Sequence, residues 1–324
     1  MYVDHVTPQG LSGPSVPVFE VEGFSREHES RRVSCGSAFQ PTPNNSPDRA
    51  LRFDRVGRGP GLRENFGMLS QTKISLEHPA FGEAATMVEH TLQLPAHDDV
   101  RLHENELHVW RADLDRIAEP LEQLSQSLSA EEQNRANSYR FTRDRRRFVV
   151  RRALLRQLLA RYAACEPDQV VLGVGQYAKP RLVHPNRVPA LEFNVSHTGG
   201  VAVFALTLGR AVGIDVESHC PREYLQIAER FYTPQELRRL TSAPGSARRD
   251  LFLRLWTCKE AALKALGAGL SIPLSAVEVS PPAVAPVVKI AEANGRWQRV
   301  QCLPLSSAAD GTCTTVAVLA TTVR

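Results

Sequence analysis

Two short stretches in the second half of the chain carry acidic residues at spacings that could bind a cation. Residues 212–217 read Val-Gly-Ile-Asp-Val-Glu, with carboxylates at Asp215 and Glu217, and residues 256–267 carry Glu260 in a helical pattern. Alternate side chains of a strand share a face, so Asp215 and Glu217 should point the same way. Three carboxylates from a strand and a helix would suit a hard cation such as Mg²⁺, which prefers oxygen ligands.

Each of these residues also has a purely structural interpretation. Acidic residues on a solvated strand face are common, and Glu260 with Lys264 could form an ordinary i,i+4 ion pair on a helix. The apolar neighbours Val212, Ile214 and Val216 favour a buried strand whose other face carries the acids. Because buried charges need a counter-charge or a metal, these neighbours strengthen the prediction of a cation site.

Hydrophobic periodicity predicts the elements that must position these residues. Residues 201–207 and 211–217 are apolar runs joined by a Gly-containing turn, which is typical of a hairpin. Residues 139–162 predict an amphipathic helix with an arginine-rich face, and residues 250–266 a second long helix that ends at a glycine. Strands after helices indicate an α+β fold with antiparallel sheet. Further strands are predicted at residues 106–112, 192–195, 277–280, 287–290, 297–302 and 314–319.

Two helix starts and a contrasting N-terminal region complete the outline. Ser129 and Thr233 are each followed three residues later by a glutamate, which is the pattern of a capping box.

Residues 1–95 are rich in Pro, Gly and Ser and show no sustained apolar period, so we expect a disordered extension there. Ordered structure is expected to begin near Asn105.

Composition limits the cellular setting and the classes of partner. The chain has 324 residues, a net charge of +4 and six scattered cysteines, without a Cys-x-x-Cys pair. An apolar run long enough to span a membrane and a secretory signal pattern are both missing, so we expect a cytoplasmic protein without a membrane partner. Nine arginines lie between residues 140 and 161. They would permit nucleic acid, phosphate ligands or an acidic protein, but a helix-turn-helix pattern is lacking, which argues against nucleic acid.

The order of several motifs resembles one family. Residues 212–217 and the run Trp-Thr-Cys-Lys-Glu-Ala-Ala-Leu-Lys-Ala-Leu-Gly at 256–267 are similar to the two diagnostic blocks of the 4′-phosphopantetheinyl transferase superfamily, of the surfactin-synthetase-activating type. Arg147, Lys179-Pro180 and Ser196-His197 precede those blocks in the expected order. The resemblance runs from about residue 106 to the C-terminus, with Ala178 standing where the family usually has Gly.

This resemblance implies a fold and an activity. The fold is two similar α/β halves related by a pseudo-twofold, here residues 96–208 and 209–324, with coenzyme A in the cleft between them. The implied enzyme is a monomeric holo-[acyl-carrier-protein] synthase. It transfers the phosphopantetheine arm of coenzyme A to a serine of an acyl or peptidyl carrier protein, in a Mg²⁺-dependent reaction that releases adenosine 3′,5′-bisphosphate. The choice between Mg²⁺ and Mn²⁺ as the metal stays open.

The resemblance also implies roles for the acidic residues and for Lys264. Asp215, Glu217 and Glu260 would hold the metal against the pyrophosphate. Lys264 would stabilise or protonate the leaving bisphosphate. Glu260 would act as the base for the carrier serine, directly or through a water.

The remaining roles concern coenzyme A and the carrier. Ser196 and His197 would bind the phosphates, and Lys259 would support the phosphate side. The 3′-phosphate and adenine side of coenzyme A would be bound by Arg147, Lys179 and Pro180. Carrier docking is expected at Phe231, Tyr232, Leu237, Arg238 and Arg239.

Two alternatives remain open beside this assignment. One is a homologue that binds carrier proteins without catalysis, although the intact set of acids and Lys264 argues against it. The other is a nucleic-acid-binding protein that uses the arginine-rich helix, whose binding should depend steeply on salt.

Overall fold

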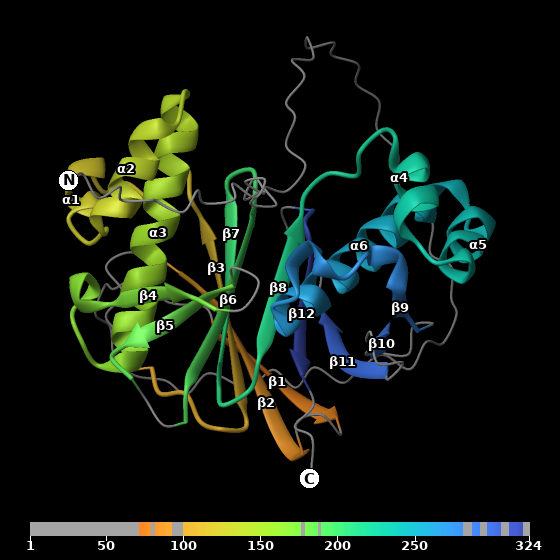
Figure 1. Ribbon diagram of the computed structural model, residues 1–324, viewed down its shortest axis with the longest axis horizontal. Helices are drawn as coiled ribbons and strands as arrows, with labels where there is room; N and C mark the ends of the chain where they lie inside the picture. The colour runs from red at the N-terminus through yellow and green to blue at the C-terminus, as the bar shows by residue number, and fades with distance from the viewer. Residues whose placement is uncertain are drawn as a thin grey trace, which may run out of the picture.

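The computed structural model describes residues 71–78, 82–92, 100–175, 179–186, 189–280, 287–291, 297–305 and 311–319. These residues form the predicted α+β fold (Figure 1), in which two five-stranded sheets lie between two long helices. Each sheet has one apolar face against its helix and packs its other face against the second sheet. None of the described helices is long and apolar enough to cross a membrane.

The first sheet has the strand order β1-β2-β3-β7-β6. The sequence alternates clearly in β3, where Trp110 and Ala112 face helix α3 and Leu107 and Val109 face the second sheet. Helix α3 covers one face, as its apolar stripe predicts. The bounds are β1 Gln71–His78, β2 Gly82–Thr91, β3 Glu106–Asp113, α3 Thr142–Ala163, β6 Leu191–Thr198 and β7 Val201–Leu208.

The second sheet has the strand order β8-β12-β11-β10-β9 and is covered by helix α6. All its described pairings are antiparallel, as the sequence predicts. The chain passes from β7 in the first sheet to β8 in the second through a turn at Gly209, whose φ of 65° suits glycine. The bounds are β8 Val212–Glu217, α6 Gly245–Leu266, β9 Val277–Val279, β10 Val287–Ala291, β11 Trp297–Pro304 and β12 Cys313–Leu319.

Shorter helices and strands surround the two sheets and their long helices. Both predicted capping boxes are confirmed, because Ser129 and Thr233 each accept a hydrogen bond from the N3 amide while the N3 glutamate accepts one from the cap amide. The short elements are α1 Leu121–Ser125, α2 Ala130–Ser138, η1 Pro167–Gln169, β4 Val171–Val174, β5 Pro180–His184, α4 Tyr224–Phe231, α5 Pro234–Ser242, η3 Gly269–Ser271 and η4 Leu274–Ala276.

The expectation of disorder up to residue 95 is wrong for residues 86–91, which form the second part of strand β2. Strand β2 pairs in parallel with β3, and its Met87 and Val88 are buried at 3% and 4% exposure. The segment 82–91 holds too few apolar residues to show a period by itself, and it becomes a strand by adding to an edge formed later in the chain. Residues 1–70 lie outside the described residues, and the division into halves at residue 208 stays a prediction.

Candidate active site

The site is built where helix α6 lies against strand β8. Gly213 makes this contact close, because a Cβ atom there would lie 2.1 Å from the carbonyl oxygen of Ala261 and 2.3 Å from the amide nitrogen of Ala265. The even-numbered residues of β8 pack into the core between the sheets, whereas Asp215 follows Gly213 on the face toward α6. Sequence alternation therefore predicted the correct face of β8.

Asp215 is the centre of the hydrogen-bond network in the site. Its Oδ1 accepts from Lys264 Nζ on α6 at 2.6 Å and from Ser196 Oγ on β6 at 3.0 Å, and Lys264 Nζ also donates to Ser196 Oγ at 3.1 Å. The side chains come from both sheets, so the network joins the two sides of the molecule. Burial alone would lower the pKa of Lys264, but Asp215 and Glu260 together raise it, so its ammonium stays charged at neutral pH.

Glu217 and Glu260 complete a cluster of acidic groups. Burial and the nearby Asp215 carboxylate raise the pKa of Glu217 to about 8 and that of Glu260 to about 7, while Lys264 opposes both shifts. The cluster has three carboxyl groups and one lysine. Because like charges repel in a buried site, the carboxyl groups resist full ionisation unless a cation binds among them.

This donor set fits a hard divalent cation. Asp215 Oδ2 is buried and has no hydrogen-bond partner among the described residues, which leaves this oxygen available to a further ligand. All the candidate donors are carboxylate oxygens, which Mg²⁺ and Mn²⁺ prefer. Among the described residues, no three histidine, cysteine, aspartate or glutamate side chains are placed so that they could hold a metal ion together as they stand.

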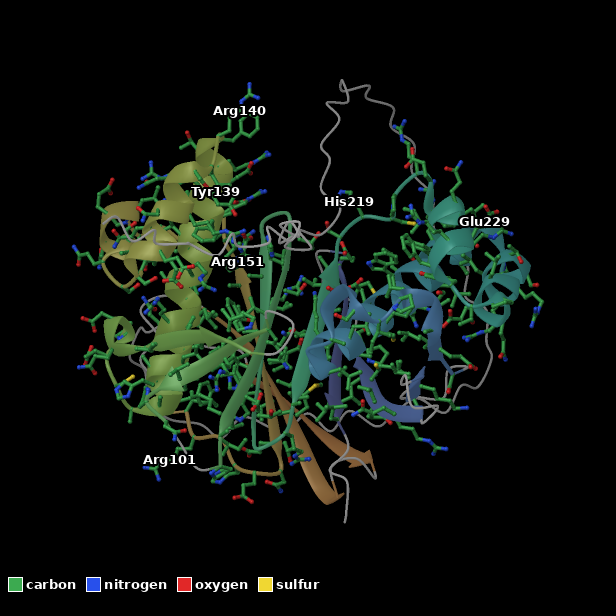
Figure 2. The ribbon with its side chains drawn as sticks, viewed as in Figure 1. Arg101, Tyr139, Arg140, Arg151, His219 and Glu229 are labelled. Carbon is green, nitrogen blue, oxygen red and sulfur yellow. The ribbon has the colours of Figure 1, made fainter. Side chains whose placement is uncertain are left out.

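Basic side chains extend the site along helix α3. Arg147 forms a two-pronged ion pair with Asp115, with Nε–Oδ1 and Nη2–Oδ2 distances of 2.9 and 2.7 Å. One turn further along α3, Arg151 Nη1 lies 2.5 Å from Nδ1 and 3.1 Å from Nε2 of His197. Figure 2 labels Arg151 on the side of α3 that faces β6 and β7. Ser196 and His197 thus link the acidic cluster to the arginines of α3.

His197 lies among three cations. Burial is the largest cause that lowers its pKa, followed by Arg151, Lys264 and Arg147, and the result is a pKa of about 3. The imidazole is therefore neutral at physiological pH. A neutral ring surrounded by positive charge suits an anionic ligand better than a metal.

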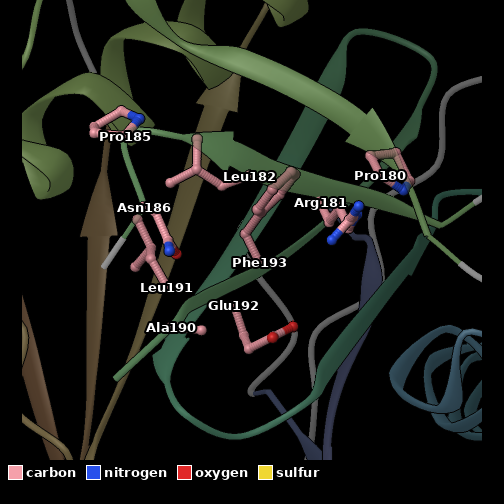
Figure 3. A pocket seen from close by; sticks show the side chains of 9 residues that line it. All are labelled: Pro180, Arg181, Leu182, Pro185, Asn186, Ala190, Leu191, Glu192 and Phe193. Atoms are coloured by element: carbon pink, nitrogen blue, oxygen red, sulfur yellow. The ribbon is translucent and has the colours of Figure 1, made fainter. Parts of the chain in front are cut away.

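Lys179 and Pro180 lie beside the site in a different arrangement from the predicted one. Lys179 Nζ donates to the carbonyl oxygens of Val212 at 3.0 Å and Ala265 at 3.2 Å, so it braces the contact of β8 with α6. Its role toward coenzyme A stays a prediction. Pro180 begins β5 and borders a hollow of about 170 Å³ between β5 and β6 (Figure 3), which none of the three carboxylates lines.

The prediction that Lys259 supports the phosphates is wrong. Its side chain is completely buried on the other side of α6, where Nζ pairs with Glu236 at 2.7 Å and donates to the carbonyl oxygens of Leu274 and Val277. Glu236 is itself completely buried and caps helix α5. Lys259 therefore holds α6 to α5 and β9, and it cannot reach a ligand at the acidic cluster.

Two further expectations about the surface are revised. Tyr232 was expected to contact a carrier, but it is buried at 4% exposure and its hydroxyl donates to the carbonyl of Phe252. Several arginines of α3 are also bound within the protein. Arg152 and Arg156 pair with Glu132, and Arg146 donates to the carbonyl oxygen of Ile117. These contacts leave less of the helix free for nucleic acid than its sequence suggests.

Sequence reasoning missed several residues of the site. Asp115 lies in no recognised motif, and Gly213 lies in the 212–217 motif but was given no role of its own; both roles depend on residues far along the chain. Thr198 and Ser218 were also missed; their hydroxyls lie 3.1 Å apart and join the ends of β6 and β8. Arg151 could have been found, because it lies four residues after Arg147 and must share its helix face.

Comparison with known proteins identifies the family. A family model described as the 4′-phosphopantetheinyl transferase superfamily matches residues 211–308, and one described as 4′-phosphopantetheinyl transferase, N-terminal, matches residues 114–208. The 4′-phosphopantetheinyl transferase HetI of Nostoc sp. is 38% identical over 195 residues, which cover 60% of this chain and 81% of HetI. The chain belongs to the 4′-phosphopantetheinyl transferase superfamily.

Two further comparisons involve one sequence relative and one solved structure. The 4′-phosphopantetheinyl transferase Sfp of Bacillus subtilis is 29% identical to this transferase, over 47% of this chain and 66% of Sfp. The solved holo-[acyl-carrier-protein] synthase of Thermotoga maritima is 27% identical and covers 34% of this chain and 62% of its own, with a TM-score of 0.28. The acidic cluster, Ser196 and His197 lie in the segments that the two family models match. The protein is thus an enzyme of the phosphopantetheinyl transferase class, which acts on carrier proteins.

Proposed function

We propose that this transferase moves the phosphopantetheine arm of coenzyme A to a serine of an acyl or peptidyl carrier protein and releases adenosine 3′,5′-bisphosphate. The observation that supports this most is the network of Asp215, Lys264 and Ser196, which joins an acidic cluster to a row of basic groups. An acidic cluster that fits a divalent cation, next to cationic side chains, suits a pyrophosphate ligand. Coenzyme A contains such a pyrophosphate.

Asp215, Glu217 and Glu260 would hold Mg²⁺ or Mn²⁺. When bound, the ion would neutralise charge on the pyrophosphate oxygens during transfer. The pKa of Lys264 is raised by its acidic neighbours, which favours a lasting positive charge over proton donation. We therefore assign Lys264 to stabilising the charge of the leaving bisphosphate.

The carrier serine supplies the nucleophile in this scheme. Its hydroxyl oxygen forms the new bond to the phosphorus of the pantetheine-bearing phosphate, and the bond from that phosphorus to the bisphosphate oxygen breaks with its electron pair. The hydroxyl proton would pass to Glu260, directly or through a water, because its carboxylate is the candidate base in this scheme. Ser196, His197 and Arg147 would bind phosphate groups of coenzyme A.

We further infer a cytoplasmic enzyme that works as a monomer. Both sheets of one chain supply side chains to the site, so a second copy is not required to complete it. The five described cysteines are free thiols, which suits a reducing compartment. Exposed Arg238 on α5 is our candidate contact for an acidic carrier surface.

A mass-spectrometric assay with several apo carrier proteins tests this proposal. We expect wild-type protein with coenzyme A and Mg²⁺ to add one phosphopantetheine to at least one carrier, and a chelator to stop the reaction until Mg²⁺ is restored. The Glu260→Gln variant should remain folded and lose at least about 100-fold in rate. No mass gain on any acyl or peptidyl carrier would refute the function, and full activity of Glu260→Gln would refute its assignment as the base.

A further inference from the structure

Arg151 stands out because it contacts His197 directly and belongs to none of the motifs recognised in the sequence. Its guanidinium lies at the imidazole edge that carries both ring nitrogens, at 2.5 and 3.1 Å. The same guanidinium lies 5.8 Å from the centre of the Phe148 ring, and Phe148 is buried. Arg151 is therefore held between a core aromatic ring and the histidine.

The neighbouring cations have carboxylates close at hand. Arg147 pairs with Asp115, and Lys264 pairs with Asp215. His197 lies between these two ion pairs and Arg151, since all three cations act on its protonation. The result is a short row of positive groups from α3 to α6 with an uncharged ring within it.

A guanidinium only donates hydrogen bonds, so its contact requires His197 to accept through a ring nitrogen. A ring that accepts in this way is neutral. The low pKa of His197, about 3, agrees with this geometry, and Arg151 is the charged neighbour with the largest effect on it. Arg151 therefore orients the imidazole, and after burial it contributes most to keeping the ring neutral.

We propose that Arg151 is a positioning residue for His197 and that the two side chains together bind a phosphate group of coenzyme A. This inference rests on the proposed function for the identity of the ligand. A phosphate near Arg151, Arg147 and Lys264 would meet the guanidinium of Arg151, the ammonium of Lys264 and the positive charge of Arg147, whose Nε and Nη2 pair with Asp115. His197 would add a hydrogen bond without adding to the repulsion among the cations.

Binding of coenzyme A without a carrier tests the inference independently of transfer. We compare wild type with Arg151→Gln, Arg151→Lys and a matched control, Arg145→Gln, which changes an exposed arginine on the same helix. Isothermal titration with coenzyme A should give a Kd about 10- to 100-fold weaker for Arg151→Gln, an intermediate Kd for Arg151→Lys and an unchanged Kd for the control. Titration with 3′-dephospho-coenzyme A shows whether Arg151 contacts the 3′-phosphate or the pyrophosphate. If Arg151→Gln and wild type bind this ligand equally well, Arg151 contacts the 3′-phosphate. If Arg151→Gln still binds it more weakly than wild type does, Arg151 contacts the pyrophosphate.

The histidine provides a readout that a merely structural arginine would not change. NMR of the His197 ring should show no titration between about pH 5 and pH 8 in wild type and in Arg145→Gln. In Arg151→Gln the titration midpoint should move upward into or toward that range. In the transfer assay, Arg151→Gln should raise the KM for coenzyme A more than it lowers kcat.

An unchanged Kd for coenzyme A in Arg151→Gln would overturn the inference, and so would an unchanged His197 titration, which would show that Arg151 does not act on the imidazole. Its failure and that of the proposed function are distinguishable. If wild type binds coenzyme A through Arg151 but modifies no carrier, the proposed function fails and the inference stands. If wild type modifies carriers and Arg151→Gln binds coenzyme A as wild type does, the inference alone fails.

Discussion

Two lysines of helix α6 illustrate how much the environment decides the role of a side chain. Lys259 and Lys264 are five residues apart, which turns them by about 140° around the helix axis. Lys264 lies at the acidic cluster, where it pairs with Asp215, whereas Lys259 is completely buried with Glu236. The same side chain thus serves the site in one position and the core in the other.

Replacing each lysine by methionine should separate these roles. Lys259→Met leaves the buried Glu236 carboxylate without its counter-charge, so we expect a loss of about 3–5 kcal/mol in the free energy of unfolding. Lys264→Met should lower the transfer rate by about 100-fold or more with a smaller loss of stability, because the Lys264 side chain is 27% exposed whereas that of Lys259 is completely buried. Urea unfolding and the carrier assay measure the two effects. Equal stability losses, or a stable but inactive Lys259→Met, would contradict the assignment.

At the scale of elements, the site depends on how closely one helix approaches one strand. Gly213 permits that approach, since the backbone of α6 occupies the place of a side chain. Lys179 strengthens it by bonding to both β8 and the last turn of α6. Because Asp215 is on the strand and Lys264 on the helix, their 2.6 Å contact exists only at this separation.

A methyl group at Gly213 should disturb both stability and activity. In Gly213→Ala, the added Cβ meets backbone atoms that cannot rotate away, so we expect a loss of about 1–3 kcal/mol in the free energy of unfolding and a marked fall in transfer rate. Gly245→Ala is the matched control, because nothing lies within 4 Å of a Cβ atom at the start of α6. The control should keep full activity. A fully active and stable Gly213→Ala would show that α6 can shift without cost to the site.

At the scale of the whole molecule, the core between the two sheets holds the active site together. That core combines Met87 from β2, Leu107 from β3 and Ile214 from β8. The same interface aligns Ser196 with Asp215, which belong to different sheets. Strand β2, in the segment expected to be disordered, therefore contributes to the interface that forms the site.

Truncation of Met87 tests this contribution. Met87→Ala removes a buried side chain from the core between the sheets, so we expect the free energy of unfolding to fall by about 2–5 kcal/mol. Gln235→Ala, at an exposed position of helix α5, should change it by no more than about 0.5 kcal/mol. Thermal and urea unfolding of both variants provide the comparison. Wild-type stability of Met87→Ala would mean that β2 does not support the fold.

The sequence by itself determined the features that depend on local pattern. Alternation placed Asp215 on the face of β8 away from the apolar core, helical periodicity predicted α3 and α6, and the glutamates after Ser129 and Thr233 marked two helix starts. The family motifs also identified the acidic cluster. Each of these signals lies within a few residues of the feature that it predicts.

Only the tertiary structure decided which groups meet across long separations. A periodic pattern tells which face of an element is apolar, but it does not tell which element lies opposite that face. Lys259 therefore resembled a site residue until its partner Glu236 was placed, and Arg151 had no predicted role until β6 brought His197 to it. Strand β2 likewise became ordered only through the edge that β3 offers. The acidic residues could be predicted from the sequence, whereas the basic groups that surround them depend on how the two sheets pack.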